Sequence, residues 1–305
     1  MMNQIRKYST STIEVISKPT RTILNEYLLN LQLANKTEAT IKKYRWILER
    51  FFRECPIPID QLHSDDVQHW LIQFSTGKKA RIIDLFLSTL TSFFQFCLEK
   101  DYIKKTVMKK RWRPKISPSL PQFLNKNEYA KVMLAAKGLS LRDQALVLFL
   151  FSSGCRQSEV SNLSIEDVYL DQQKANVKGK KIRQVHFSKE TAIVLKDYLQ
   201  TRSYVDTDPL FLNHSGGRLH PTSIYEITIK LGRKAGISQR LNPRVCRQTF
   251  AMNMFARGTN IEFISNMKGG HKSLNSTPNY LRIPTEAMIL HLKKMGYRDP
   301  SMNVK

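Results

Sequence analysis

Residues 104–123, KKTVMKKRWRPKISPSLPQF, separate two parts of the chain with different sequence patterns. Between positions 104 and 115 stand seven Lys or Arg residues and no acidic ones, and prolines follow at positions 114, 118 and 121. Proline prevents one continuous helix, and like charges repel one another unless an anion lies alongside. We therefore predict an extended basic linker that follows a phosphate backbone, joining a domain of residues 1–115 to a domain of residues 116–305. A solvated charged loop is the alternative.

The overall charge favours the same kind of partner. The 305 residues include 49 Lys or Arg and 25 Asp or Glu, which gives a formal net charge of +24. This surplus opposes self-association and attracts polyanions, with nucleic acid as the leading candidate. No apolar run reaches the roughly 18 residues of a spanning helix, and the N-terminus does not resemble a signal peptide. We expect a cytoplasmic, nucleoid-associated protein with no membrane partner.

The spacing of the cysteines argues against a fold held together by zinc or by disulfides. Cys55, Cys97, Cys155 and Cys246 form no C-x-x-C pair and no Cys–His metal pattern. Their spread argues against a zinc site or a disulfide framework and suits a reducing compartment. We expect them to be small buried residues.

The first part of the chain has the apolar spacing of helices. Apolar residues recur every three or four positions around residues 23–31, 41–52, 65–74 and 83–97, which predicts a bundle of four amphipathic helices. Ser64 is predicted to cap the third helix, with two acidic residues in its first turn, where the helix dipole favours them. We expect about half of the basic residues on the polar faces to contact a ligand. The candidates are Lys42, Lys43, Lys79 and Arg81, together with Lys109, Lys110, Arg111 and Arg113 of the linker.

The second part mixes helices with a few strands. Residues 125–138 begin with a capping-box pattern, Asn125 with Glu128, and residues 141–154 are so apolar that they should form a central helix. A short helix follows Gly154, and others are predicted at residues 189–199 and 221–236. Asn242 and Pro243 have the residue types of an N-cap and a first helical position.

A hairpin is predicted between these helices. The stretch KANVKGKKIRQVHF, residues 174–187, reads as two strands with a turn around Gly179, and Val185 and Phe187 share one face of the second strand. The fold class expected for the whole chain is mainly α, with a small β-sheet or hairpin in the second part.

A phosphodiester substrate sets requirements that can be compared with these residues. Cleavage needs a nucleophile, positive charge around the phosphoryl oxygens and an acid for the leaving oxygen. A metal would need clustered carboxylates, but the adjacent acids Glu166 and Asp167 are better explained as partners of a helix dipole. We therefore expect no metal and no cofactor. Arginine forks can hold phosphate oxygens, and a phosphotyrosine link would conserve the bond energy for rejoining.

Three motifs resemble those of one known family. SGCRQSEVSNL, NPRVCRQTFAM and GGHKSLNSTPNYLRI follow one another in this order, and they are similar to the motifs of tyrosine recombinases of the phage-integrase and Xer type. The resemblance extends over nearly the whole chain and includes TnpI-type transposon resolvases. It implies an N-terminal four-helix, SAM-like core-binding domain, a basic linker and a C-terminal catalytic domain. One such motif would be weak evidence, whereas three at the right separations are specific.

The resemblance implies a role for each matching residue. Arg156 and Arg247 match the two arginines that clamp the scissile phosphate, and His271 matches a histidine that donates a hydrogen bond to a phosphoryl oxygen. Tyr280, nine residues after His271, matches the nucleophile that forms a 3′-phosphotyrosyl intermediate.

A hairpin lysine of the family protonates the leaving 5′ oxygen. Among Lys178, Lys180 and Lys181, Lys178 matches the family pattern best, because it directly precedes Gly179. Lys181 resembles a second basic position that contacts the DNA backbone.

Two positions depart from the family pattern. The family usually has histidine where this chain has Arg244, and again where it has Gln248. Arg244 can still contact a phosphate, but its pKa, above about 12, prevents it from shuttling a proton near neutral pH. If the family histidine helps to deprotonate the tyrosine, that step must occur elsewhere or more slowly. We expect an active enzyme; loss of strand exchange is the alternative.

The expected partner is double-stranded DNA with inverted-repeat core sites. The resemblance implies a tetramer on DNA, whose protomers are joined by the helix predicted around residues 287–295. The alternative is that this helix folds back on its own domain. Accessory DNA-bound protomers would fit a resolvase. We expect no arm-binding domain, because helices start near residue 20. Integration or excision, resolution of transposon cointegrates and resolution of replicon dimers all remain open. A topoisomerase of type IB and a sequence-specific DNA-binding protein without catalysis are the rival functions.

Overall fold

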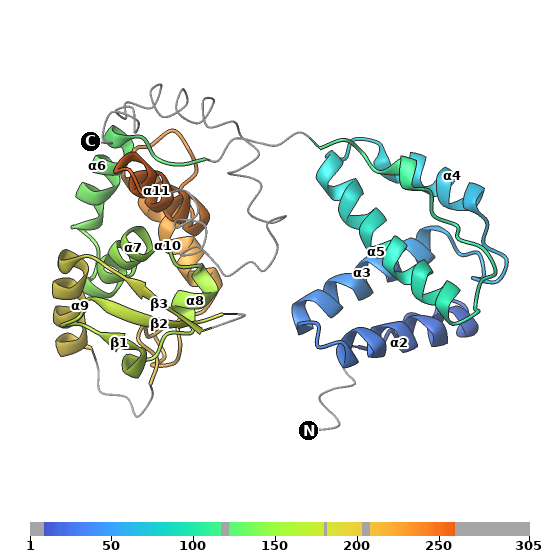
Figure 1. Ribbon diagram of the computed structural model, residues 1–305, viewed down its shortest axis with the longest axis horizontal. Coiled ribbons are helices and arrows are strands. Elements are labelled where there is room, and N and C mark those ends of the chain that lie inside the picture. Colours follow the sequence, from blue (N-terminus) through green and yellow to red (C-terminus); the bar gives the residue numbers. More distant parts are fainter. Residues whose placement is uncertain (1–8, 117–121, 180–181, 203–207, 260–305) are drawn as a thin grey trace. The chain divides into compact units, whose positions relative to one another are not determined.

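The computed structural model describes residues 9–116, 122–179, 182–202 and 208–259 (Figure 1). The chain divides into two compact units between Ser117 and Pro118. The boundary predicted from the linker, at residue 115, falls two residues before this division.

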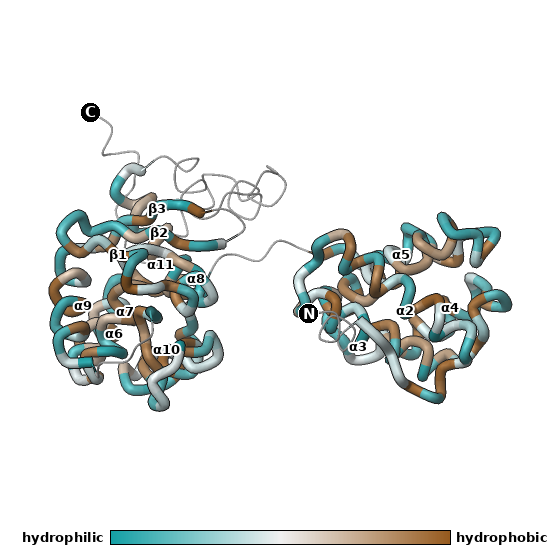
Figure 2. Tube along the Cα trace, turned by 90° about the horizontal axis from the view of Figure 1, so that it is seen from below, coloured by the Kyte–Doolittle hydropathy of each residue, from teal (hydrophilic) through white to brown (hydrophobic). Residues whose placement is uncertain are grey.

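The first unit is the helical bundle that the apolar spacing predicted. Within its described residues the helices are α2 Lys18–Leu33, α3 Glu38–Glu54, α4 Ser64–Ser75 and α5 Ala80–Glu99. Their apolar positions are interleaved with polar ones along each helix (Figure 2), and the apolar side chains meet in one core. Each helix can be amphipathic and still marginal alone, because most of its stability comes from packing this face.

Aromatic rings dominate that core. The ring of Phe51 meets those of Phe52, Trp70 and Phe94 edge to face, at centroid distances of 5.0, 4.8 and 6.0 Å. Edge-to-face pairs add about 0.5–1.5 kcal/mol each beyond the burial of their area. Contacts of this kind give the bundle one well-defined packing.

The start of α4 differs from the prediction by one residue. His63, rather than Ser64, is the N-cap, and its backbone N–H donates to Asp66 Oδ2 at 2.8 Å. The Ser64 hydroxyl instead donates to the carbonyl of Val107 at 3.1 Å. Ser64 therefore ties the helix to the chain that follows α5.

One prediction about apolar runs was wrong. In the part of the chain that the structure describes, α5 is long and apolar enough to cross a membrane by length and composition alone. Its apolar residues, however, are needed inside the bundle, since Phe86, Leu90 and Phe93 are almost fully buried. The composition of α5 is thus accounted for by core packing.

The basic segment is less extended than predicted. Ile103 and Val107 are buried in the core of the first unit, and Met108 and Trp112 pack against it. A short 3₁₀ helix, Lys110–Trp112, lies within the stretch that we expected to be extended. Apolar residues interleaved with the lysines anchor this segment to the bundle, so its charges are held on the surface of the first unit.

The second unit packs helices around a small sheet. The described helices are α6 Lys126–Ala136, α7 Leu141–Ser153, α8 Gln157–Ser161, α9 Lys189–Thr201, α10 Pro221–Lys234 and α11 Pro243–Ala256. Helix α7 is central, as predicted, because residues 145–151 are all buried. It packs against both α9 and α11. The predicted fold class is confirmed.

Several predicted local features of this unit are confirmed. Asn125 Oδ1 accepts from the N–H of Glu128 at 2.8 Å, and Glu128 Oε2 accepts from the N–H of Asn125 at 3.0 Å. Helix α6 nevertheless ends at Ala136 rather than at the expected residue 138. Asn242 Oδ1 caps α11 by accepting from the N–H of Val245 at 3.1 Å. The four cysteines are buried thiols.

The predicted hairpin exists and gains a third strand. Strands β2 Lys174–Lys178 and β3 Ile182–His186 pair antiparallel, and β1 Val168–Tyr169, which was not predicted, joins the free edge of β2. The Cα register sets Val177 opposite Arg183 and Lys178 opposite Ile182. Because successive side chains alternate between faces, Arg183 shares the buried face of Val177, Val185 and Phe187.

Candidate active site

Arg156 follows a turn that requires glycine. Gly154 caps α7 with a φ of 61°, in the left-handed region. A Cβ at this position would lie 2.3 Å from Cδ1 of Phe250 on α11. Any other residue would therefore strain the left-handed backbone and clash with the Phe250 ring. The chain then enters α8 with Arg156 as its N-cap residue. The glycine thus lets α11 approach the turn that carries Arg156.

Glu159 fixes the orientation of Arg156. Its carboxylate accepts from Arg156 Nη1 at 2.8 Å and from the backbone N–H of Arg156 at 2.7 Å. The Glu159 side chain is 3% exposed, whereas that of Arg156 is 38% exposed. A buried carboxylate therefore holds the base of a guanidinium that still faces solvent.

A second arginine shares the same carboxylate. Arg183 on β3 donates from Nη1 and Nη2 to the two oxygens of Glu159, each at 3.0 Å. The prediction from motifs missed both Glu159 and Arg183. The sequence contained a signal for these two residues. Arg183 stands at every-second-residue spacing with Val185 and Phe187, which places it on the inner face of the strand, and an arginine there needs a buried anion.

These contacts change the pKa of Glu159. Burial alone would raise the pKa of this carboxyl, but hydrogen bonds from Arg183 and Arg156 outweigh burial and lower it from 4.5. Glu159 is therefore ionised at neutral pH, and it links two cationic side chains from α8 and β3.

Arg247 reaches the same turn from α11. Its guanidinium donates to the carbonyl of Gly154, two residues before Arg156. Burial, followed by the charge of Arg156, lowers the pKa of Arg247 to about 10. Arg247 thus stays protonated at neutral pH, in a position where a further negative charge would be stabilising. The structure brings together the two arginines that the motifs singled out.

Lys178 lies at the end of β2 and is held by acidic residues. Its Nζ lies 3.0 Å from Asp167 Oδ1 and 3.7 Å from Glu166 Oε1. The hydrogen bond with Asp167 is the main reason that the pKa of Lys178 is raised. Our reading of these two acids as helix-dipole partners was incomplete, because the 3₁₀ turn Ile165–Asp167 directs both of them toward the lysine. Asp167 also accepts from the N–H of Ser164 at 3.1 Å.

The two unusual positions of the second arginine motif lie on α11. Arg244 is exposed in the first turn of this helix, one turn before Arg247. Gln248 is 8% exposed and therefore belongs to the packed interior. Only Arg244 is available to a ligand in solution.

Three predicted site residues lie outside the described residues. They are Lys181, His271 and Tyr280, together with the helix predicted around residues 287–295. Their roles remain predictions.

The DNA-binding candidates of the first unit are mostly exposed. Exposed residues among them are Lys42, Lys43, Lys79, Arg81, Lys110, Arg111 and Arg113, whereas Lys109 is half-buried. Some carry acidic neighbours: Lys42 pairs with Glu38, Lys109 lies 3.9 Å from Asp65, and Arg113 lies 3.5 Å from Asp84. These contacts are exposed ion pairs of small energy, so they leave the cations available to phosphates.

Arg50, on a face where we had expected basic ligand contacts, has a structural role instead. Its guanidinium lies 5.2 Å from the ring centroid of Phe74 and 5.8 Å from that of Phe86. It also donates to Glu54 at 2.8 Å. Arg50 is thus held by aromatic rings and a carboxylate, and we do not count it as a DNA contact.

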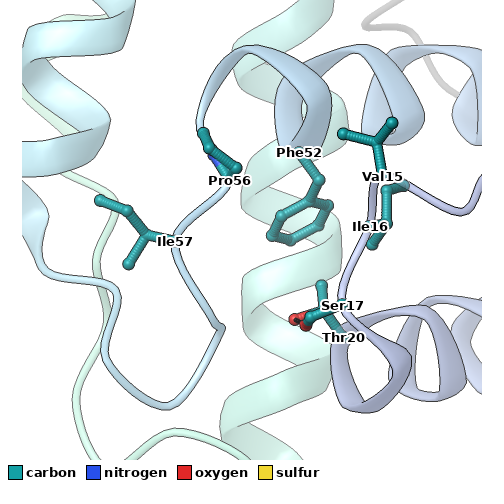
Figure 3. Close-up of a pocket in the computed structure, with 7 residues that line it drawn as sticks. All are labelled: Val15, Ile16, Ser17, Thr20, Phe52, Pro56 and Ile57. Carbon is teal, nitrogen blue, oxygen red and sulfur yellow. Dashed lines mark hydrogen bonds between the residues drawn. The ribbon is translucent and has the colours of Figure 1, made fainter.

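A small hollow in the first unit has no features of a reactive site. Figure 3 shows its lining of mainly apolar side chains, among them Phe52 and Ile57. Its two hydroxyls are already used, since Ser17 donates to Thr20 at 2.9 Å and Thr20 accepts from the N–H of Ile59 at 3.4 Å.

In the described ranges, no group of three His, Cys, Asp or Glu residues could hold a metal ion.

Comparison with known families agrees with the two units. Residues 122–286 match the phage integrase family, and residues 24–101 match the phage integrase N-terminal SAM-like domain. Tyrosine recombinase XerA of Pyrococcus horikoshii is 32% identical over 273 residues, which cover 87% of this chain and 90% of that protein. Tyrosine recombinase XerC of Thermodesulfovibrio yellowstonii is 29% identical over 264 residues, covering 82% and 87% respectively.

Solved structures show the same fold. A crystal structure of XerA recombinase is 25% identical, covers 92% of this chain and 99% of its own, and has a TM-score of 0.52. XerH recombinase, solved in a post-cleavage complex with a palindromic difH substrate, is 19% identical, with a TM-score of 0.71 and coverage of 93% and 91%. The combination of fold, motifs and relatives disfavours the reading as a DNA-binding protein without catalysis. The chain belongs to the phage integrase family and is a tyrosine recombinase, an enzyme that breaks and rejoins DNA.

Proposed function

We propose that Arg156 and Arg247 hold the scissile phosphate of a recombination site while Tyr280 attacks it. The phenol of Tyr280 gives up its proton to solvent, its oxygen bonds to phosphorus, and the bond from phosphorus to the 5′ oxygen breaks. Lys178 gives a proton to that oxygen, and His271 donates a hydrogen bond to a phosphoryl oxygen. The 3′-phosphotyrosyl link retains the bond energy, so a 5′ hydroxyl can rejoin the strand without ATP.

The convergence of Arg156 and Arg247 at the Gly154 turn carries this proposal. Arg156, Arg183 and Arg247 surround one carboxylate, that of Glu159. Three guanidinium groups and one carboxylate leave a surplus of two positive charges in a partly buried place. A phosphodiester would supply negative charge there, and its charge grows in the transition state, where arginine forks stabilise it most.

Lys178 suits the role of the acid. It lies at the end of a strand, 50% exposed, where a DNA backbone could reach it. The amine is protonated at neutral pH and so has a proton to give, and its hydrogen bond to Asp167 raises its pKa further. Lys180 and Lys181 remain the alternatives for this role, and Lys181 is the better candidate for a backbone contact.

We further propose double-stranded DNA with inverted-repeat core sites as the substrate. The XerH complex with a palindromic substrate supports this idea by analogy, and the net charge of +24 supports strong phosphate binding. Two duplexes and four cuts imply a tetramer on DNA, assembled through the segment around residues 287–295. The place of action is the cytoplasm, on the nucleoid.

The biological role is integration or excision of a mobile element, cointegrate resolution or dimer resolution. Inverted repeats beside a transposase gene next to this gene would favour cointegrate resolution, with accessory protomers on nearby DNA. Relaxation of supercoiled DNA by the protein on a plasmid without paired sites would instead favour a topoisomerase.

A nicked duplex tests the chemistry. A tight-binding duplex is first selected from a library of inverted repeats, and a nick is then placed just downstream of the cut so that the freed fragment diffuses away. The wild-type protein should form a covalent adduct on the 3′ phosphate in the presence of EDTA. Tyr280→Phe should bind equally well and form no adduct, whereas Tyr169→Phe, a matched change at an exposed tyrosine, should leave the adduct unchanged.

Two outcomes would contradict the proposal. An adduct with Tyr280→Phe would show that another residue is the nucleophile. A wild-type protein that binds the duplex tightly and never forms an adduct would revive the reading as a DNA-binding protein without catalysis.

A further inference from the structure

We propose that Arg183 is a positioning residue that fixes the β2–β3 hairpin, and with it Lys178, against the turn that carries Arg156. The inference rests on the proposed roles of Arg156 and Lys178. Arg183 itself needs no contact with DNA, because both of its terminal nitrogens donate to Glu159.

The strand register links Arg183 to Lys178. Arg183 stands opposite Val177, the residue next to Lys178, and Ile182 stands opposite Lys178 itself. Val177 is fully buried, whereas Ile182 is 72% exposed. The pair of Val177 and Arg183 is therefore the last inward-facing pair before the turn, and it sets how far the end bearing Lys178 stands from the protein body.

Glu159 is the point at which hairpin and turn meet. Its Oε1 accepts from Arg156 Nη1 and Arg183 Nη1, and its Oε2 accepts from the Arg156 N–H and Arg183 Nη2, at 2.7–3.0 Å. A carboxylate has about four acceptor positions, so this one is fully used. The two-point contact with Arg183 fixes angle as well as distance, which a single hydrogen bond would not do.

The burial of this contact explains why arginine is needed. Arg183 is 17% exposed and Glu159 is 3% exposed, so water cannot readily replace either partner. Lysine would keep the charge but supply one point of contact in place of the planar fork. Loss of the fork would let the hairpin tilt, and a shift of about 1 Å in a catalytic group lowers a rate by roughly 100-fold.

Cleavage of two matched duplexes tests the inference. One duplex has the normal 5′ oxygen at the cut, and the other has sulfur there, which leaves without an acid. Arg183→Gln should cleave the oxygen duplex roughly 100-fold more slowly than the wild type, and the sulfur duplex should recover about tenfold or more of that loss by removing the need for the acid. Arg183→Lys should lie between Arg183→Gln and the wild type.

Three controls make the result specific. Arg156→Gln should not be rescued by sulfur, because it removes charge from the phosphate clamp. His186→Ala changes an exposed residue of the same strand and should behave as the wild type on both duplexes. Arg183→Gln added to Glu159→Gln should lose little more than Glu159→Gln alone, because Glu159→Gln already removes the partner of Arg183. Thermal unfolding of each variant separates misplacement of Lys178 from loss of the folded unit.

The outcomes distinguish failure of this inference from failure of the proposed function. If the sulfur duplex restores cleavage by Lys178→Ala but not by a folded Arg183→Gln protein, the role of Arg183 is wrong and the role of Lys178 stands. Wild-type rates for Arg183→Gln on the oxygen duplex would overturn it too. If Lys178→Ala is itself not rescued, the assignment of Lys178 as the acid is wrong, and the present inference falls with it.

Discussion

The interiors of the two units differ in chemistry. The first unit is closed by aromatic rings around Phe51. Most of its described ion pairs lie on the surface, such as Arg50 with Glu54, whose side chains are 35% and 38% exposed, and Arg45 with Glu49 is a more buried pair. In the second unit, Glu159 and Asp167 are buried and each binds a basic residue of the candidate site. Of the residues that the structure describes, these two are the charged ones in the buried set.

The different placement of charged residues suits the two units to different tasks, DNA binding and catalysis. A surface ion pair contributes little energy, since water competes for both partners and salt screens their charges. A buried carboxylate costs free energy unless it is fully bonded, and once bonded it holds its partner in one orientation. The first unit is thus suited to broad contact with phosphates, and the second unit is suited to placing a few cations accurately.

The largest expected effect comes from the turn at Gly154. Gly154→Ala should lower the stability of the second unit by about 4 kcal/mol, because the left-handed backbone and the contact with Phe250 both oppose a Cβ. Gly77 provides a matched control in the first unit, since it has a φ of +70° and nothing within 4 Å of an added Cβ. Gly77→Ala should cost only about 1 kcal/mol. Hydrogen exchange in α7 and α4 measures the two effects, and equal losses would contradict the comparison.

The next effect contrasts a buried carboxylate with an exposed one. Glu159→Gln should cost about 3 kcal/mol, as expected when one partner of a buried ion pair is removed. Glu54→Gln, at a side chain that is 38% exposed, should cost no more than about 1 kcal/mol. Urea unfolding monitored in each unit gives both values.

The pH dependence of this loss has a definite sign. Folding lowers the pKa of Glu159 below 4.5, so its ionic contribution is fully present above that value and is lost as the pH falls through the folded pKa. The stability difference between the wild type and Glu159→Gln should therefore be constant from pH 6 to pH 7 and shrink below about pH 4.5. A difference that grows on acidification would mean that Glu159 is not held by its arginines.

Phosphate binding by the first unit gives a third test. Neutralising Lys109, Lys110 and Arg111 together should weaken binding to all DNA sequences by about 100-fold at 0.15 M salt and flatten the log–log salt slope by about 2 to 3. Lys18, Lys36 and Lys100 are also exposed in this unit, and their joint neutralisation controls for net charge. An equal change in the control would show that the basic segment makes no particular contact.

The smallest effect concerns Arg244. If this exposed residue adds charge to the phosphate site, Arg244→Ala should slow cleavage by about tenfold, a loss of about 1.4 kcal/mol in transition-state binding. Arg244→His should retain part of the rate. Arg233→Ala on α10, also exposed, should change neither rate nor binding. A wild-type rate in Arg244→Ala would remove Arg244 from the predicted catalytic set.

The sequence alone determined the helices, the hairpin and the family. The period of apolar residues depends only on local geometry, so it identified the four helices of the first unit, and the caps at Asn125 and Asn242 follow from side chains that bond to their own neighbours. Three ordered motifs likewise required no tertiary information.

Only the tertiary structure decided which charges meet. Glu159 and Arg183 are 24 positions apart, and Arg247 reaches a carbonyl 93 positions before it, so no local pattern predicts these contacts. The same holds for Lys178 with Asp167 and for the basic segment, whose interleaved apolar residues dock on a core formed by distant helices. The physical reason is that a buried charge is stable only beside its partner, and the fold alone determines where that partner lies.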